Sequence, residues 1–334
     1  VVLLDIVPFD LKDEEKDNPT ARNRIVNDAL KSTLKSNPSP IYKKNLAKHI
    51  KTWNFDDNLD WIKDCDWILE AIIEKLDIKK SLFEKVEKHR KPGSLITSNT
   101  SGIPIEMMLE GRSDDFKQHF CGTHFFNPPR YLRLLEIIPS TQTHQEVVDF
   151  FMDYGDRFLG KQTVLCKDTP AFIANRVGVF SICAIFQLIN EMDLTVEEVD
   201  ALTGPLTGRP KSATLRTCDV VGLDTMIKVA NGVYENCPED ERRDIFKVPD
   251  YVLKMEENNW LGDKSGQGFY KKTKDENGKR QIMALNLKTM DYEPKSKPKF
   301  ASVAQAKQSD DLKERIKILG YADDKAGQFL RKLG

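Results

Sequence analysis

A histidine and a glutamate have the chemical types and surroundings needed to move a proton. His124 stands in an apolar stretch and Glu136 in an aliphatic one, and two consecutive prolines turn the chain between them. Both stretches are typical of buried strands. If they lie side by side, the carboxylate can meet the imidazole, which is the kind of partner that a buried glutamate needs. Such a pair is a general base with an orienting group. The alternative is a core histidine without a catalytic role; a metal centre is not expected, because no third ligand follows at a suitable spacing.

Polar residues also follow two other predicted strands. Asp5 closes the apolar run that opens the chain, where a carboxylate can accept ribose hydroxyls of a dinucleotide and repel a 2′-phosphate. The hydroxyl and amide residues at 98–101 follow a buried run, at the place where open α/β sheets bind ligands. The alternatives are an ordinary surface aspartate at position 5 and a helix cap at Ser101, for a helix that enters at Pro104.

Two further polar residues stand in the second half of the chain. Thr169 and Pro170 predict the start of a helix, which places Asn175 in its second turn among apolar residues. A buried amide demands hydrogen bonds, either with a ligand or with a neighbouring helix. The stretch 261–270 is a glycine-rich turn with Lys264 at its centre, and by itself it indicates only a loop.

The elements that must position these residues change in character near residue 166. Before that point buried strands alternate with amphipathic helices, and the strands are expected at 1–5, 67–73, 94–98, 120–125, 134–138 and 163–166. This alternation predicts an α/β domain with a parallel sheet and helices on both faces. Helical patterns then follow one another at 171–191, 195–203, 222–235 and 248–257, which predicts an all-α domain. A hairpin at 281–292, a tight turn at 277–278 and a charged helix at 309–319 are expected in the remainder.

Composition excludes several classes of protein. The 334 residues carry a formal net charge of -1, which gives no electrostatic footprint for nucleic acid. Six cysteines without a C-x-x-C pair indicate reduced packing residues of a cytoplasmic protein. The apolar, uncharged stretch 177–190 is too short to span a membrane and is apolar on too many faces for one contact, so it predicts a buried helix or a homodimer interface.

Taken together, these segments resemble the 3-hydroxyacyl-CoA dehydrogenase family over about residues 1–272. The resemblance rests on the following motifs, in this order: Ser98-Asn-Thr-Ser101, His124-Phe-Phe-Asn127-Pro128, Glu136, Lys167-Asp-Thr-Pro-Ala-Phe-Ile-Ala-Asn175-Arg176, Val221-Gly-Leu-Asp224 and Lys264-Ser-Gly-Gln-Gly-Phe-Tyr270. It implies NAD-dependent oxidation of a 3-hydroxyacyl-CoA in fatty acid β-oxidation. His124 would be the general base, Glu136 its orienting partner, and Ser101 and Asn175 would bind the reacting oxygen of the substrate. The cofactor contacts that it implies are Asp5, Glu74, Lys79, Ser101, Asn127 and Lys264.

The sequence departs from the family pattern at the cofactor. No glycine precedes Gly93, so the glycine-rich turn that holds a pyrophosphate is absent, and we expect a Rossmann-like domain at 1–166 without its first strand, that turn and the first helix. The helical domain is expected at 167–272, and 273–334 reads as an extension toward a further domain, as in long bacterial forms that continue into an enoyl-CoA hydratase. Two alternatives stay open: a sister dehydrogenase for a short-chain or non-CoA 3-hydroxy acid, and a non-catalytic scaffold that retains the fold.

Overall fold

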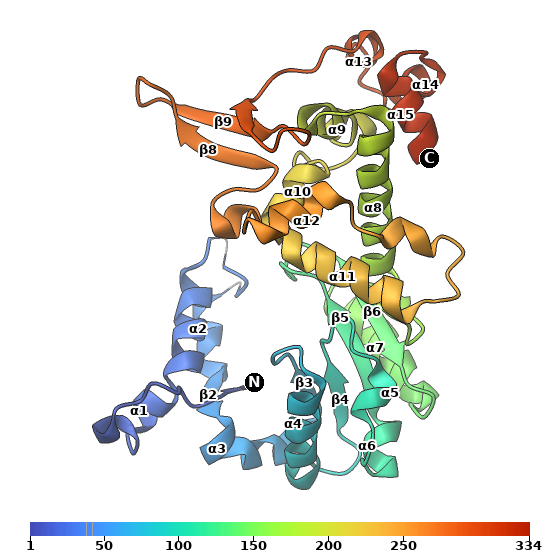
Figure 1. The fold of residues 1–334 in the computed structure, drawn as a ribbon. Helices are drawn as coiled ribbons and strands as arrows, with labels where there is room; N and C mark the ends of the chain where they lie inside the picture. Colours follow the sequence, from blue (N-terminus) through green and yellow to red (C-terminus); the bar gives the residue numbers. More distant parts are fainter. Residues whose placement is uncertain (38, 42) are drawn as a thin grey trace. The chain divides into compact units, whose positions relative to one another are not determined.

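The chain folds as two compact units. The computed structural model describes residues 1–37, 39–41 and 43–334 (Figure 1). The first unit is Val1–Phe172 and the second is Ile173–Gly334. The structure thus divides the chain a few residues after the expected boundary at 166, and residues 273–334 belong to the second unit.

A five-stranded sheet forms the centre of the first unit. Its strand order is β3-β4-β5-β6-β7, with bounds Trp67–Glu70, Leu95–Ser98, Phe120–Phe125, Leu134–Pro139 and Gln162–Leu165. All neighbouring pairs are parallel except β5 and β6, which are antiparallel. The expectation of a wholly parallel sheet is therefore wrong at this pair. Its connection, residues 126–133, is shorter than the roughly dozen residues that a parallel crossover needs.

A second, two-stranded sheet precedes it. β1 (Val2–Asp5) pairs in parallel with β2 (Lys51–Asn54), and α2 (Arg24–Lys35) lies between them in sequence. Strand β2 was not predicted, because Lys51-Thr-Trp-Asn54 has neither an apolar run nor a clear alternation. Within the described residues β1 pairs only with β2, and β3 pairs only with β4.

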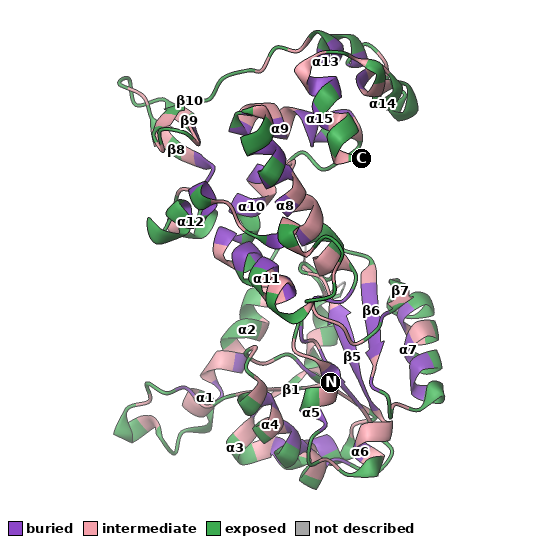
Figure 2. Ribbon diagram, turned by 45° about the vertical axis from the view of Figure 1, so that its right-hand side comes forward, coloured by how far each residue is buried: buried purple, intermediate pink, exposed green. Residues whose placement is uncertain are grey.

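Helices cover both faces of the five-stranded sheet. On one face α4 (Leu76–His89), α5 (Ile105–Met108) and α6 (Asp114–Gln118) share a core with strand residues such as Phe120 and Ile138. On the other face α7 (Gln145–Arg157) packs on the next residues along each strand, Cys121 and Ile137. Neighbouring residues on a strand point to opposite faces, so β5 and β6 are buried on both sides (Figure 2). The remaining short elements of this unit are η1 (Asp13–Glu15), α1 (Pro19–Arg22), η2 (Lys44–His49), α3 (Phe55–Asn58) and η3 (Leu59–Asp64).

The second unit is mainly helical, as expected. Its helices are α8 (Ala174–Met192), α9 (Val196–Leu202), η4 (Pro205–Thr207), α10 (Leu215–Val221), α11 (Leu223–Asn236), η5 (Arg243–Phe246), α12 (Asp250–Glu257), η6 (Asp263–Ser265), α13 (Ala301–Ala306), α14 (Leu312–Tyr321) and α15 (Lys325–Leu333). An antiparallel sheet is formed by β8 (Tyr270–Lys274), β9 (Arg280–Leu285) and β10 (Tyr292–Pro294). The expected tight turn joins β8 to β9, and Gly278 has the left-handed backbone, φ 76°, that favours glycine.

Helix α8 begins later than the sequence predicts. Ala171 and Phe172 have positive φ angles of 62° and 49°, which no α-helix accommodates, so the helix starts at Ala174 rather than at Pro170. Asn175 therefore lies in the first turn of α8 and not in the second. No helix in the described part of the chain is long and apolar enough to cross a membrane.

Candidate active site

The antiparallel pairing of β5 with β6 brings the candidate base to its carboxylate. The register sets His124 opposite Glu136, and Nδ1 of the histidine lies 2.7 Å from Oε2 of the glutamate. Both residues are buried, with 5% and 1% of their surfaces exposed. A carboxylate accepts, so Nδ1–H donates this hydrogen bond, which leaves the lone pair on Nε2. The arrangement can take a proton at Nε2 and balance the resulting charge at Nδ1.

Aromatic rings surround this imidazole. The ring centroid of Phe126 lies 4.4 Å from that of His124, and the centroid of Phe172 lies 5.7 Å away. These rings limit the access of water to the imidazole, and a poorly hydrated site strengthens the interaction between an imidazolium and its carboxylate.

A buried cluster closes the carboxyl end of β3. Glu70 accepts hydrogen bonds from Lys79 Nζ at 2.7 Å, from the backbone N–H of Ile72 at 2.6 Å and from Ser98 Oγ at 2.5 Å. Lys79 is only 1% exposed, and a buried ammonium group needs a counter-charge such as this carboxylate. Glu70 was missed from the sequence. The sequence did contain a signal for it, since Glu70 is a single carboxylate inside the apolar run 67–73. A buried glutamate needs a partner, and the same argument had singled out Glu136.

Glu74 connects this cluster to the loop after β4. Its Oε1 accepts from Thr100 Oγ1 at 2.6 Å, from the backbone N–H of Ser101 at 2.9 Å and from Ser101 Oγ at 3.3 Å, while Oε2 lies 3.3 Å from Lys79 Nζ. Burial acts to raise the pKa of Glu74, but these hydrogen bonds and the lysine charge outweigh it and lower the pKa from its usual value. Glu74 is therefore a carboxylate at neutral pH, and its side chain is 31% exposed at the edge of the sheet.

Ser101 does not cap a helix, which corrects one of the two expectations for it. Helix α5 begins after Pro104 without a side-chain cap of its own. Asp168 takes that place, since its carboxylate accepts from the backbone N–H groups of Ile105 at 2.8 Å and Glu106 at 3.0 Å. A carboxylate at a helix N-terminus is favoured by the helix dipole as well as by these hydrogen bonds.

The loop after β4 is also tied to β5. Asn99 Oδ1 accepts from the backbone N–H of Phe125 at 2.9 Å, and the N–H of Asn99 donates to the carbonyl of Glu70 at 2.8 Å. Phe125 follows His124 directly, so the Asn99 amide fixes the spacing between the base and the polar loop 98–101. The ends of β3, β4 and β5 thus form one connected polar site.

The other predicted residues belong to other elements of the chain. Asp5 ends β1 in the separate two-stranded sheet, and its Oδ1 accepts from the N–H of Ile6 at 2.7 Å. Asn127 is exposed in the connection after β5. Asn175 and Lys264 belong to the second unit, where Lys264 forms an ion pair with Asp224.

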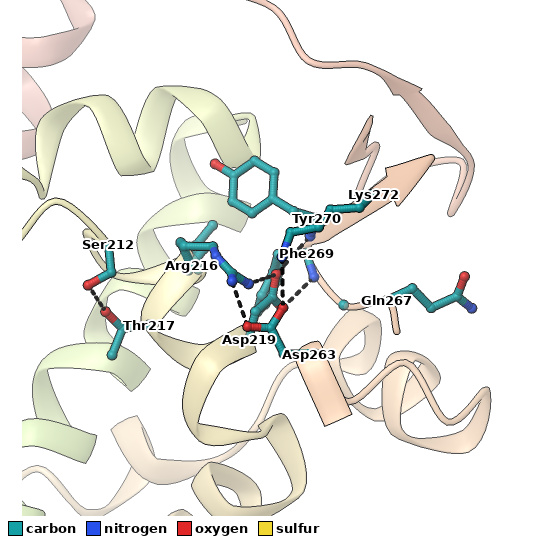
Figure 3. A network of polar contacts seen from close by, with 12 residues as sticks. Ser212, Arg216, Thr217, Asp219, Asp263, Gln267, Phe269, Tyr270 and Lys272 are labelled. Carbon is teal, nitrogen blue, oxygen red and sulfur yellow. Dashed lines mark hydrogen bonds and ion pairs between the residues drawn. The ribbon is translucent and has the colours of Figure 1, made fainter. Parts of the chain in front are cut away.

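The glycine-rich turn of the second unit is built around a buried aspartate (Figure 3). Asp219 accepts from the backbone N–H groups of Phe269 at 2.8 Å and Tyr270 at 2.9 Å. A Cβ on Gly268 would lie 2.1 Å from Asp219 Oδ1, and one on Gly262 would lie 2.2 Å from the carbonyl oxygen of Asp219, so both glycines are required by close approach. Burial raises the pKa of Asp219 to about 6. The sequence predicted the turn, but it did not indicate its partner, Asp219, which lies some fifty residues earlier.

Comparisons with known proteins agree with this architecture. Residues 2–169 match the family model of the 3-hydroxyacyl-CoA dehydrogenase NAD binding domain, and residues 172–272 match that of the C-terminal domain. A probable 3-hydroxyacyl-CoA dehydrogenase of Bacillus subtilis (strain 168) is 46% identical over 336 residues, which cover 99% of this chain and 42% of that protein. One of Deinococcus radiodurans is 46% identical over 276 residues, which cover 83% of this chain and 77% of that protein.

A solved structure shows the same fold. The 3-hydroxybutyryl-CoA dehydrogenase of Escherichia coli K12 has a TM-score of 0.65 and 26% identity, with 80% of this chain and 53% of that chain covered. The chain spans less than half the length of the Bacillus relative and about three quarters of the Deinococcus one.

Proposed function

Because the chain belongs to the 3-hydroxyacyl-CoA dehydrogenase family, we propose that it oxidises (S)-3-hydroxyacyl-CoA to 3-ketoacyl-CoA with NAD in fatty acid β-oxidation. The hydrogen bond between His124 and Glu136 carries the proposal, since this reaction removes a proton from a hydroxyl group and needs a base. A non-catalytic scaffold has no need of a buried, paired imidazole.

In this proposal Nε2 of His124 takes the proton of the 3-hydroxyl group. The C3–H bond breaks as the C3–O bond becomes a carbonyl, and NAD, when held by the residues named below, would supply the acceptor for the hydride. Glu136 holds the imidazole through Nδ1 and stabilises the imidazolium that forms. Ser101 and Asn175 are proposed to donate hydrogen bonds to the reacting oxygen, where negative charge develops in the transition state.

The residues at the ends of β3 and β4 suit the ribose and nicotinamide part of NAD. The ionised and partly exposed Glu74 is an acceptor for ribose hydroxyls, and the hydroxyl of Ser101 lies beside it. Lys79 is buried between Glu70 and Glu74, so it would act by positioning Glu74. Asp5, Asn127 and Lys264 are proposed as further cofactor contacts, Asp5 with the adenosine ribose. No glycine precedes Gly93, so these residues do not include the backbone turn that a pyrophosphate needs.

We further propose that the protein forms a homodimer through its helical unit. On α8 the side chain of Val177 is 63% exposed, and on α10 those of Val220 and Val221 are 58% and 57% exposed. Apolar side chains exposed to this degree suit a contact with a second copy of the chain.

The proposed function is tested with the full-length protein and three kinds of substrate. Oxidation of NADH is followed with acetoacetyl-CoA and with a long-chain 3-ketoacyl-CoA, and reduction of NAD with a free 3-hydroxy acid. We expect turnover of the CoA thioesters and none of the free acid. Turnover of the free acid alone would favour the sister dehydrogenase, and no turnover of any of them would favour the scaffold.

A further inference from the structure

One lysine of the first unit contacts the loop that joins the proposed base to its carboxylate. The chain leaves α7 through Gly160, whose φ of 64° turns it so that Lys161 immediately precedes β7. The backbone N–H of Lys161 donates to the carbonyl of Gly155 at 2.9 Å, and that of Gln162 donates to the carbonyl of Arg133 at 2.7 Å. These hydrogen bonds place Lys161 next to the end of the loop between β5 and β6.

This loop, residues 126–133, connects the strand of His124 to the strand of Glu136. It begins with Phe126, whose ring centroid lies 4.4 Å from that of the histidine. Every residue at 127–133 is exposed, so burial in the core does not fix the path of the loop. Exposed segments with few packing contacts open at a low cost in free energy unless specific contacts hold them.

The side chain of Lys161 supplies such contacts. Its Nζ donates to the backbone carbonyls of Pro129 and of Leu132, the latter at 2.9 Å. The same Nζ lies 5.7 Å from the ring centroid of Phe125, which follows the base directly. In the part of the chain that the structure describes, Lys161 forms no ion pair with a carboxylate, and burial lowers its pKa. The ammonium group therefore gathers backbone oxygen atoms of the loop and does not balance a charge.

We propose that Lys161 is a positioning residue, which holds the loop 126–133 so that Phe126 stays against the imidazole of His124. Lys161 acts through the loop and not on the reacting atoms. With the loop released, water would reach Nε2, where it would compete with the substrate hydroxyl and would screen the imidazolium from Glu136. The effect on turnover rests on the dehydrogenase function proposed above, whereas the shielding of the imidazole does not.

Chemical modification of His124 by diethyl pyrocarbonate tests this proposal in the full-length protein. The reagent acylates an unprotonated ring nitrogen, so the rate at each histidine, measured by mass spectrometry of peptides, reports access to Nε2. K161M removes the donors, and His124 should react about tenfold faster because hydrogen bonds from a charged group are lost. K161R restores donors for the same carbonyls and should react at close to the wild-type rate. F126L, which lacks the shielding ring, should react as fast as K161M.

Two controls separate this effect from a general change in the protein. K85M removes an exposed lysine of α4 and should leave the rate at His124 unchanged. His89, an exposed histidine of α4, is the internal reference and should react at one rate in all variants. With acetoacetyl-CoA and NADH, kcat should fall about tenfold in K161M and be retained in K161R and K85M. If thermal unfolding shows that K161M is not folded, K161Q takes its place.

Three results would overturn the proposal. Wild-type reactivity of His124 in K161M would show that the lysine does not maintain the shielding. Equal acceleration in K161R would show that the donors are not what holds the loop. Faster modification with an unchanged kcat would show that Lys161 only supports the structure of the loop. Absence of turnover in the wild type would contradict the proposed function instead, and the modification rates would still decide whether Lys161 shields the imidazole.

Discussion

At the scale of single residues, the hydrogen bond between His124 and Glu136 depends on the register of two strands. A shift by one residue would turn one of the two side chains to the opposite face of the sheet. The four other residue pairs of this register, three before His124 and one after it, are apolar or small, and most of their side chains are buried, which holds the register. The geometry of the proposed base is thus a property of the sheet core as much as of the two residues.

The variant E136Q tests the proposed partnership. An amide keeps the shape and a hydrogen bond but removes the negative charge that stabilises a protonated imidazole. The acidic limb of the pH–rate profile should therefore move to lower pH, with a lower kcat. E84Q, on the exposed face of α4, is the control and should leave the profile unchanged. A profile of E136Q with an unmoved acidic limb would show that the two side chains are not coupled in the reaction.

The sequence alone singled out His124, Glu136 and Ser101 as candidate residues. It did not predict all the residues that surround them. Apolar neighbours mark a polar residue as buried, and strand ends mark the ligand edge of a sheet, so these signals are local. The partnership of Asp168 with α5 joins residues more than sixty positions apart, and the Thr-Pro pair beside it indicated a different helix. A partner at that distance follows from tertiary packing, which no local pattern encodes.

At the scale of elements, Asp219 holds the glycine-rich turn to α10. Its carboxyl pKa is raised to about 6 by burial, whereas an aspartate in an unfolded chain titrates near 3.9. Between about pH 4 and pH 6 the folded state retains a proton that the unfolded state has lost. The free energy of unfolding contributed by this group therefore falls as pH rises through that window, and it is fully present only below it.

The variant D219N makes the contribution of Asp219 to the pH dependence of the free energy of unfolding measurable. Asparagine cannot ionise, so the difference in free energy of unfolding, wild type minus variant, should decrease by on the order of 2 kcal/mol from pH 4 to pH 6.5. Chemical denaturation at several pH values gives both curves. Parallel curves over this range would contradict the raised pKa. The amide also loses one of the two acceptors for Phe269 and Tyr270, so the variant should be less stable at pH 4.

The bounds of elements with continuous hydrophobic runs were predicted well from the sequence. The bounds of elements that adjoin residues with unusual backbone angles were not. Strands β4, β5 and β6 are found within a residue or two of expectation, because each is a continuous buried run. The start of α8 was misplaced because Ala171 and Phe172 adopt positive φ, a conformation that their residue types disfavour. Such strain is imposed by the fold around it and cannot be read from composition.

At the scale of the whole molecule, more of the apolar side chains of helix α8 pack into the core of its own unit than the sequence suggested. Phe186 is fully buried against Tyr251 and Phe269, so a charge at that position would test folding and not assembly. Val177 is the informative position, since it is largely exposed.

The variant V177D tests the proposed homodimer. A charge placed in an apolar contact between subunits is costly, so light scattering should show a dimer for the wild type and a monomer for the variant. Thermal unfolding confirms that the variant is folded. A variant that remains a dimer, or a wild type that is a monomer, would contradict an interface at this face of α8.

The most direct test of the central claim is the turnover of H124Q in the full-length protein. Glutamine keeps polarity and approximate size but cannot take a proton at neutral pH, and general base catalysis contributes roughly 10² to 10⁴-fold. H89Q replaces an exposed histidine of α4 as the control. With acetoacetyl-CoA and NADH, kcat of H124Q should fall by that factor while substrate binding and the activity of H89Q are retained. Wild-type kcat in H124Q would contradict the assignment of His124 as the base.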